Sequence, residues 1–270
     1  MNAVPLARAL RYLRLLRRQV AASVLLALQY RADFVLDGFL SLLRSAATVV
    51  PLLVVFRDRD AFAGWTFAEA LLVMGWFMLL RGIIEGAISP SLTTVVDHIR
   101  KGTLDFVLLK PADAQFLVST SRFELWPVAR LVSAGVIFGW AFHLIGRPPS
   151  PVGVLLACAL LVTSTLVLYS LWILTVSAAF YVVKVDNMIY LFDSIFDAAR
   201  WPASIFKGVL EVIVTFVIPL AILTTFPAEA LLGRLGAAAF WESVAGAVGF
   251  GLAARFVWTR SLSRYTSASS

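Results

Sequence analysis

The stretch Ile99-Arg100-Lys101-Gly102-Thr103-Leu104-Asp105-Phe106-Val107-Leu108-Leu109-Lys110-Pro111 decides how this chain is arranged. It lies within a polar interval, residues 89–122, and long apolar runs flank that interval on both sides. Its cations make it costly to place in a bilayer. Its apolar residues nevertheless recur at helical spacing, which a solvated loop does not need. We therefore predict a broken pair of short helices outside the membrane, whose apolar side chains seat against another protein.

The ends of these two helices follow from residues with strong local preferences. Ser89-Pro90 is expected to begin the first helix, because Ser caps a helix and Pro fits its first turn. Gly102 is expected to end it, and Lys110-Pro111 to end the second.

The composition is that of an all-α integral membrane protein. Hydrophobic residues make up 60% of the 270 residues and charged residues 14%, unlike the balance of a soluble domain. The formal net charge of +7 is explained by cations gathered in loops on one side of a membrane, so a nucleic-acid partner is not expected.

The apolar runs predict six transmembrane helices in one domain, residues 34–270, after an amphipathic connecting helix in residues 1–33. Five spans are expected at residues 34–56, 66–88, 126–144, 152–183 and 236–258. The remaining span lies either in residues 187–207, which carry a polar stripe, or in residues 208–226. If residues 187–207 do not cross, they lie at the inner interface. If residues 208–226 do not cross, they dip into the membrane as a re-entrant hairpin. Hydropathy leaves this choice open.

The cations indicate the orientation. Six cations up to Arg31, four in the polar interval, three from Arg255 onward and Lys184 fall on one side of this topology. The loops expected on the other side hold four. Because cytoplasmic loops collect Lys and Arg, both termini are expected in the cytoplasm.

Charged residues inside the expected spans are candidates either for a transport path or for ion pairs between spans, because an intramembrane charge normally faces protein or water. Asp37 and Arg44 are seven residues apart and share a helix face. Arg81 and Glu85 are one turn apart and are expected to pair. The remaining candidates are Asp193, Asp197 and Arg200.

Motifs of several enzyme classes are missing from the sequence. It has no Gly-x-x-x-x-Gly-Lys-Ser/Thr run to hold ATP, no Gly-x-Ser-x-Gly nucleophile turn and no paired-histidine zinc motif. The acidic residues are scattered, without a pair at a spacing suited to acid–base catalysis. We therefore expect a protein without catalytic activity of its own.

Short pieces along the whole chain resemble the ABC-2 type transporter permeases, in particular small six-span permeases that work with a separate ATPase. The pieces are Tyr30-Arg31-Ala32-Asp33-Phe34, Gly64-Trp65, Ile99-Arg100-Lys101-Gly102-Thr103-Leu104-Asp105, Leu108-Leu109-Lys110-Pro111, Trp201-Pro202, Pro219, Phe226-Pro227-Ala228 and Arg264-Tyr265-Thr266-Ser267-Ala268.

The resemblance implies that a cytoplasmic coupling helix between spans two and three, at residues 90–110, docks in a groove of an ABC ATPase subunit. The residues implied in that contact are Ile99, Arg100, Lys101, Gly102, Thr103, Leu104, Asp105, Leu108, Leu109 and Lys110. It further implies residues 187–203 as the fifth span and 208–227 as a re-entrant element, although Asp193, Asp197 and Arg200 make that span unusually polar.

The resemblance also implies how the protein works. The chain would bind no cofactor, with ATP and Mg²⁺ held by the partner subunit, and would pair with a second copy or a related permease. It would export a substrate across a bacterial inner membrane. The alternative is a stand-alone secondary transporter or channel, whose intramembrane charges carry ions without ATP. The residues do not identify the substrate.

Overall fold

The computed structural model describes residues 3–29, 31–181, 185–208, 210 and 218–265. These residues form an almost entirely helical protein with one two-stranded hairpin, in which Ala61 pairs with Thr66. The elements are α1 (Ala3–Gln29), α2 (Arg31–Val55), β1 (Ala61–Phe62), β2 (Trp65–Thr66), α3 (Phe67–Ile83), η1 (Ile84–Ile88), α4 (Ser89–Arg100), α5 (Asp105–Leu108), α6 (Ala114–Ser119), α7 (Val128–Ile145), α8 (Pro151–Ser177), η2 (Ala178–Phe180), α9 (Val185–Phe196), η3 (Asp197–Arg200), η4 (Ala203–Ile205), η6 (Ala221–Thr225), α11 (Phe226–Leu232) and α12 (Ala237–Leu262).

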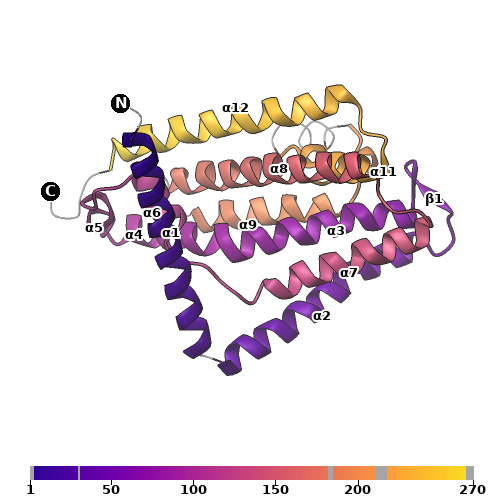
Figure 1. Cartoon of the computed structure of the whole chain (residues 1–270), viewed down its shortest axis with the longest axis horizontal. Coiled ribbons are helices and arrows are strands. Elements are labelled where there is room, and N and C mark those ends of the chain that lie inside the picture. The colour runs from indigo at the N-terminus through magenta and orange to yellow at the C-terminus, as the bar shows by residue number, and fades with distance from the viewer. Residues whose placement is uncertain (1–2, 30, 182–184, 209, 211–217, 266–270) are drawn as a thin grey trace.

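The long helices lie side by side along the long axis of the molecule, and α1 crosses them at one end (Figure 1). Helices α5 and α6 lie at the same end as α1, which we call the platform end. The β1–β2 hairpin lies at the opposite end, the hairpin end (Figure 1).

Five helices are long and apolar enough to cross a membrane, so the chain is a multi-pass membrane protein. They are Val35–Val55, Phe67–Arg100, Val128–Ile145, Pro151–Phe180 and Ala237–Leu262. The five spans predicted outright from the sequence correspond to these helices in order.

A sixth helix that is both long and apolar enough to cross a membrane is not present among the described residues. Helix α9 has 12 residues and η3 adds four, and the apolar segment Ala221–Leu232 is also shorter than a full span. Residues 209 and 211–217, which belong to the alternative prediction of a span at residues 208–226, lie outside the described residues.

Helix α4 begins at Ser89, with Pro90 in its first turn, as the sequence predicts. Ser89 does not cap it, however, because the helical stretch from Phe67 to Arg100 is continuous. A π-helical segment, η1, precedes Pro90, and in it the Ser89 amide donates to the carbonyl of Ile84. Proline lacks the N–H that would bond to the carbonyl of Gly86 one turn earlier. The Glu124 amide supplies that bond instead, at 2.9 Å. The proline therefore leaves an acceptor to which a distant segment attaches.

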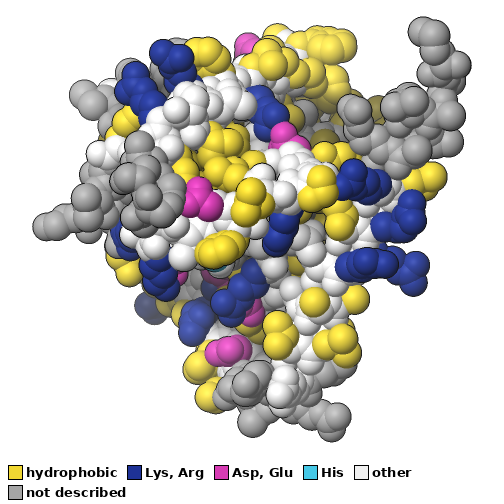
Figure 2. Space-filling model, turned by 90° about the vertical axis from the view of Figure 1, so that its left-hand side faces the viewer, with side chains coloured by type: hydrophobic (Ala, Val, Ile, Leu, Met, Phe, Trp, Pro, Cys, Tyr) yellow, Lys and Arg dark blue, Asp and Glu magenta, His cyan; other side chains and the backbone are white. Residues whose placement is uncertain are grey.

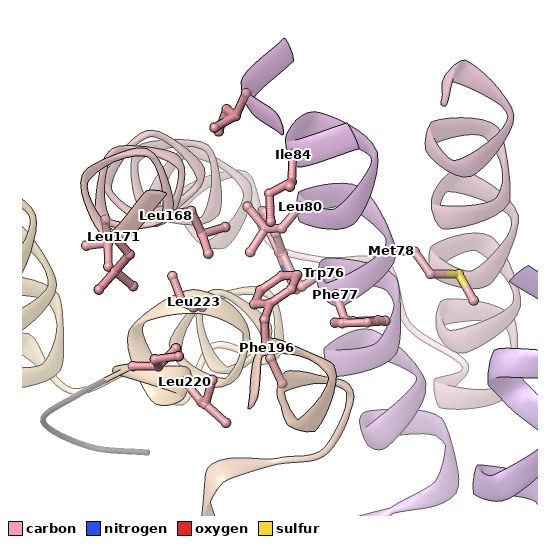
Figure 3. Packing of buried hydrophobic residues seen from close by; sticks show 14 of the residues in the cluster. Trp76, Phe77, Met78, Leu80, Ile84, Leu168, Leu171, Phe196, Leu220 and Leu223 are labelled. Carbon is pink, nitrogen blue, oxygen red and sulfur yellow. The ribbon is translucent and has the colours of Figure 1, made fainter. Parts of the chain in front are cut away.

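Helix α3 forms the centre of the protein, because its residues from Ala70 to Met78 are buried on all sides. Leucines from α8 and from the η6 segment converge on it together with Phe196, as Figure 3 shows. On another side α3 packs closely on α7, where a Cβ added at Gly75 would lie 2.7 Å from the ring of Phe138. The absence of a side chain at Gly75 thus lets the two helices approach each other.

Candidate coupling platform and intramembrane charge cluster

After α4, the rest of the polar interval, residues 101–122, forms a short helical platform that contains α5 and α6. Gly102 adopts φ +64°, a left-handed conformation that suits glycine, and the chain then turns into α5. The turn is held by a 2.8 Å hydrogen bond between His98 Nδ1 and the Thr103 hydroxyl. The interval therefore contains two helical pieces separated at Gly102.

The apolar side chains of the platform separate into outward-facing and buried ones. Leu109 is 81% exposed and Phe106 72% exposed, whereas Leu104 is completely buried in the chain's own core. Of the other residues predicted for partner contact, Arg100, Lys101 and Lys110 are exposed, and Ile99, Gly102, Thr103, Asp105 and Leu108 are half-buried.

One placement here differs from the sequence interpretation. The Leu104 side chain stabilises the fold in this structure and is not presented to a partner. Phe106, one of the apolar side chains predicted to seat against another protein, has one of the most exposed large side chains of this segment. Phe106 and Leu109 are three residues apart and share a helix face.

Asp113, between α5 and α6 of the platform, joins three helices. Its carboxylate accepts the Phe116 amide at 3.1 Å and so caps α6, and it accepts two hydrogen bonds from Arg255 of α12 at 2.7 and 3.2 Å. Its own amide donates to the Tyr12 hydroxyl of α1 at 3.1 Å. The hydrogen bond from Arg255 lowers the pKa of Asp113 below its ordinary value.

Further contacts attach the platform to α8 and α4. Gln115 donates to the Tyr169 hydroxyl of α8 at 3.0 Å, and Ser119 lies 2.8 Å from the same hydroxyl. Ser91 of α4 donates to the carbonyl of Arg122 at 2.6 Å and accepts its amide at 3.0 Å. A displacement of the platform would therefore strain contacts to α1, α4, α8 and α12.

The platform end carries many cations. Figure 2 shows this end of the molecule, with Lys and Arg side chains spread across it and hydrophobic side chains between them. Exposed arginines of α1, among them Arg11, Arg14 and Arg17, add to those of the platform.

A cluster of four charges connects three helices within the membrane-spanning part. Arg81 Nε lies 3.0 Å from Glu85 Oε1, and a terminal nitrogen of Arg81 lies 2.7 Å from Asp193 Oδ1 of α9. Arg130 Nε of α7 lies 2.8 Å from Glu85 Oε2, a pairing of charges without a well-directed hydrogen bond. The exposed fractions of the Arg81, Glu85 and Arg130 side chains are 18, 17 and 9%.

A second pair follows directly along the chain from Asp193. Arg200 lies 3.0 Å from Asp197 within η3, and its guanidinium lies 5.6 Å from the ring centre of Phe77. The polar stripe of residues 193–200 thus faces α3, with both acids paired to arginines.

A family model described as ABC-2 family transporter protein matches residues 42–269, which is most of the chain. The chain belongs to the ABC-2 transporter family. Comparisons with curated proteins and with solved structures returned no match. Membership of the ABC-2 family makes the chain a membrane transport component, and this agrees with its five long apolar helices.

Two of the charged residues predicted either for a transport path or for ion pairs between spans form no ion pair with this cluster. Asp37 and Arg44 are exposed on α2, and no ion pair joins either of them to a residue that the structure describes. Arg44 lies near the middle of the candidate span Val35–Val55. An arginine side chain at that depth is not suited to contact with lipid tails.

Arg130 belongs to the charge cluster, although sequence reasoning placed it only near the inner end of the third span. Its partner Glu85 is 45 residues earlier in the chain. The only signal in the sequence was an arginine within two residues of the start of an apolar run, a position that flanking cations commonly occupy.

Proposed function

We propose that this chain is the permease subunit of an ATP-driven exporter, without catalytic activity of its own. A separate ATPase subunit binds ATP and Mg²⁺ and docks on the platform. The observation that carries this proposal is the exposure of Phe106 and Leu109 beside Lys110, directly before residues 113–122, which are hydrogen-bonded to α1, α4, α8 and α12. Large apolar side chains ringed by polar groups are typical of a protein–protein contact.

The platform end, in this proposal, faces the bacterial cytoplasm. The distribution of cations supports this orientation, since cytoplasmic loops collect Lys and Arg. Movement of the ATPase subunits would shift the platform as a rigid body. The contacts of Asp113 and Tyr169 would pass that shift to α12 and α8. The direction, export, rests on the resemblance to small ABC-2 permeases.

We further propose that residues 185–204 form the remaining crossing, the fifth of six in chain order, and that the segment after residue 217 is re-entrant. Ser204 donates to the carbonyl of Ala63 at the hairpin end, at 3.1 Å. The carbonyl of Ile222 accepts a 2.9 Å bond from Ser164, 13 residues into α8 and so about 20 Å from its start. Arg234 then pairs with Glu69 at 2.9 Å, near the start of α3.

A second permease subunit, in this proposal, covers the face of α2 that carries Arg44. An arginine facing lipid at mid-membrane costs about 2.5–3.5 kcal/mol or more. A neighbouring subunit, identical or related, would enclose a water-filled path along this face and remove that cost.

The charge cluster around Arg81 also suits a secondary transporter that moves ions without ATP. The two functions differ in the need for a partner. Co-expression of the chain with a neighbouring ATPase, followed by purification through a tag on one subunit, measures complex formation and ATP turnover. A complex with stimulated turnover supports the permease, whereas ion-driven flux by the chain alone supports the alternative.

Variants of the platform sharpen this test. Leu109→Asp is expected to abolish association with the ATPase at unchanged thermal stability, because Leu109 makes little contact within the chain. Leu109→Met, the matched control, should keep the complex. Leu104→Ala should lower stability by about 2–5 kcal/mol, because it empties a fully buried site. Full association of the Leu109→Asp variant would refute the docking assignment.

A further inference from the structure

A cavity of about 720 Å³ lies between α1, the start of α2, the end of α4 and residues 121–126. Its volume falls within the roughly 300–1,000 Å³ of small-molecule sites. Its lining residues come from the second half of α1 and the start of α2, two helices that meet at a corner in Figure 1. The loop that forms one wall is the same loop whose Glu124 amide caps the carbonyl left free by Pro90.

The cavity lies beside the ends of two candidate spans. Asp37, in its wall, is near the start of the candidate span Val35–Val55. Trp126, also in the wall, comes two residues before the candidate span Val128–Ile145. Tryptophan at the end of a span is typical of the membrane interface. Leu26 of α1, 59% exposed, adds an apolar edge from which acyl chains could continue into the bilayer.

The charged groups of the cavity include both signs. Arg122 lies 2.7 Å from Glu124, and the Arg122 side chain remains 63% exposed, so its guanidinium has donors to spare. His98 uses Nδ1 in its bond to Thr103, which leaves its other ring nitrogen for the cavity. Asp37 is exposed and has no ion pair among the described residues.

These groups match a ligand that carries a phosphate and an ammonium group. Arg122 and His98 can donate to phosphate oxygens, and Asp37 can accept from an ammonium group. Among the described lining residues, Arg122 and Glu124 neutralise each other, and Asp37 adds a negative charge that no other lining residue balances. A headgroup with a negative charge alone would therefore be disfavoured.

We propose that this cavity binds the headgroup of an aminophospholipid, such as phosphatidylethanolamine, from the membrane leaflet at the platform end. The bound headgroup would link α1 and α2 to the end of α4 and to the loop 121–126. This inference does not rest on docking of an ATPase, since every group involved belongs to this chain.

Native mass spectrometry of the full-length purified chain tests the proposal. Phosphatidylethanolamine is expected to bind at least tenfold more tightly than phosphatidylglycerol, and Asp37→Asn should remove that preference. Asp58→Asn, an exposed acid beyond the far end of α2, is the matched control and should retain it. Equal affinity for the two lipids, or an unchanged preference in Asp37→Asn, would overturn the proposal.

Two further binding experiments test whether the lipid occupies this cavity and whether the ligand is a membrane lipid or a soluble compound. Ala22→Trp fills the cavity and should weaken binding of phosphatidylethanolamine at least tenfold, whereas Ala21→Trp, next to the lining residues, should not. Soluble phosphoethanolamine should bind at least tenfold more weakly than the lipid, because it makes no contact with Leu26. Equal binding of the soluble compound would rule out a membrane lipid as the ligand. Full binding by Ala22→Trp would place the lipid elsewhere on the protein.

Discussion

Glu85 is the carboxylate on which the intramembrane charge cluster depends, because it contacts both Arg81 and Arg130. Glu85→Gln keeps the shape of this side chain and removes its charge. Arg81 would retain Asp193 at 2.7 Å. Arg130, whose side chain is 9% exposed, would lose its only ion-pair partner among the described residues.

The expected cost follows from the burial of that arginine. Removing one partner of a buried ion pair costs about 3–5 kcal/mol, because the remaining charge is buried without compensation. Asp193→Asn should cost less, about 1–2 kcal/mol, since the Asp193 side chain is 33% exposed and Arg81 keeps Glu85. In the double variant Glu85→Gln/Arg130→Gln the orphan charge is gone, so part of the lost stability should return.

The free energy of unfolding in lipid bicelles, followed by tryptophan fluorescence during titration with a denaturing detergent, measures these differences. The expected order of stability is wild type, Asp193→Asn, then Glu85→Gln, with the double variant above Glu85→Gln. A double variant that loses the sum of the two single effects would refute the reasoning, because it would show that Arg130 is not left uncompensated in Glu85→Gln.

Two further outcomes follow from other contacts. The hydrogen-bonded ion pair with Arg255 lowers the pKa of the Asp113 carboxyl. The stability that this pair contributes is therefore present above the unfolded-state pKa of about 3.9 and is lost as the pH falls below that pKa. Thermal stability measured between pH 6 and 3 should therefore fall less steeply in Arg255→Gln than in the wild type, and parallel curves would contradict this role. Gly75→Ala should destabilise the protein by about 1–3 kcal/mol, because the new Cβ would lie 2.7 Å from the ring of Phe138. Gly139→Ala, in open space on α7, should be neutral or slightly stabilising in the same unfolding assay, and equal losses in the two variants would contradict the packing argument.

Local patterns in the sequence were sufficient to locate the long helices. A run of apolar residues as long as the bilayer is thick predicts a span whatever lies next to it, and α2, α7 and α12 follow such runs. The end of α4 at Gly102 was likewise predictable, because a left-handed residue after a helix strongly favours glycine. The spacing of Arg81 and Glu85 predicted their contact, because residues four apart on a helix are neighbours.

Other features depended on which elements pack against one another. Pro90 predicted the start of α4, but not that α4 would continue α3 through η1, with the distant Glu124 amide bonded to the carbonyl of Gly86. Leu104 and Leu109 have the same side chain and lie five residues apart, yet one is buried and the other is 81% exposed. The sequence alone therefore determined the apolar spans, whose length is a property of each segment. The tertiary structure decided which side chains of the platform face outward and which charges meet, because these depend on contacts between residues far apart in the chain.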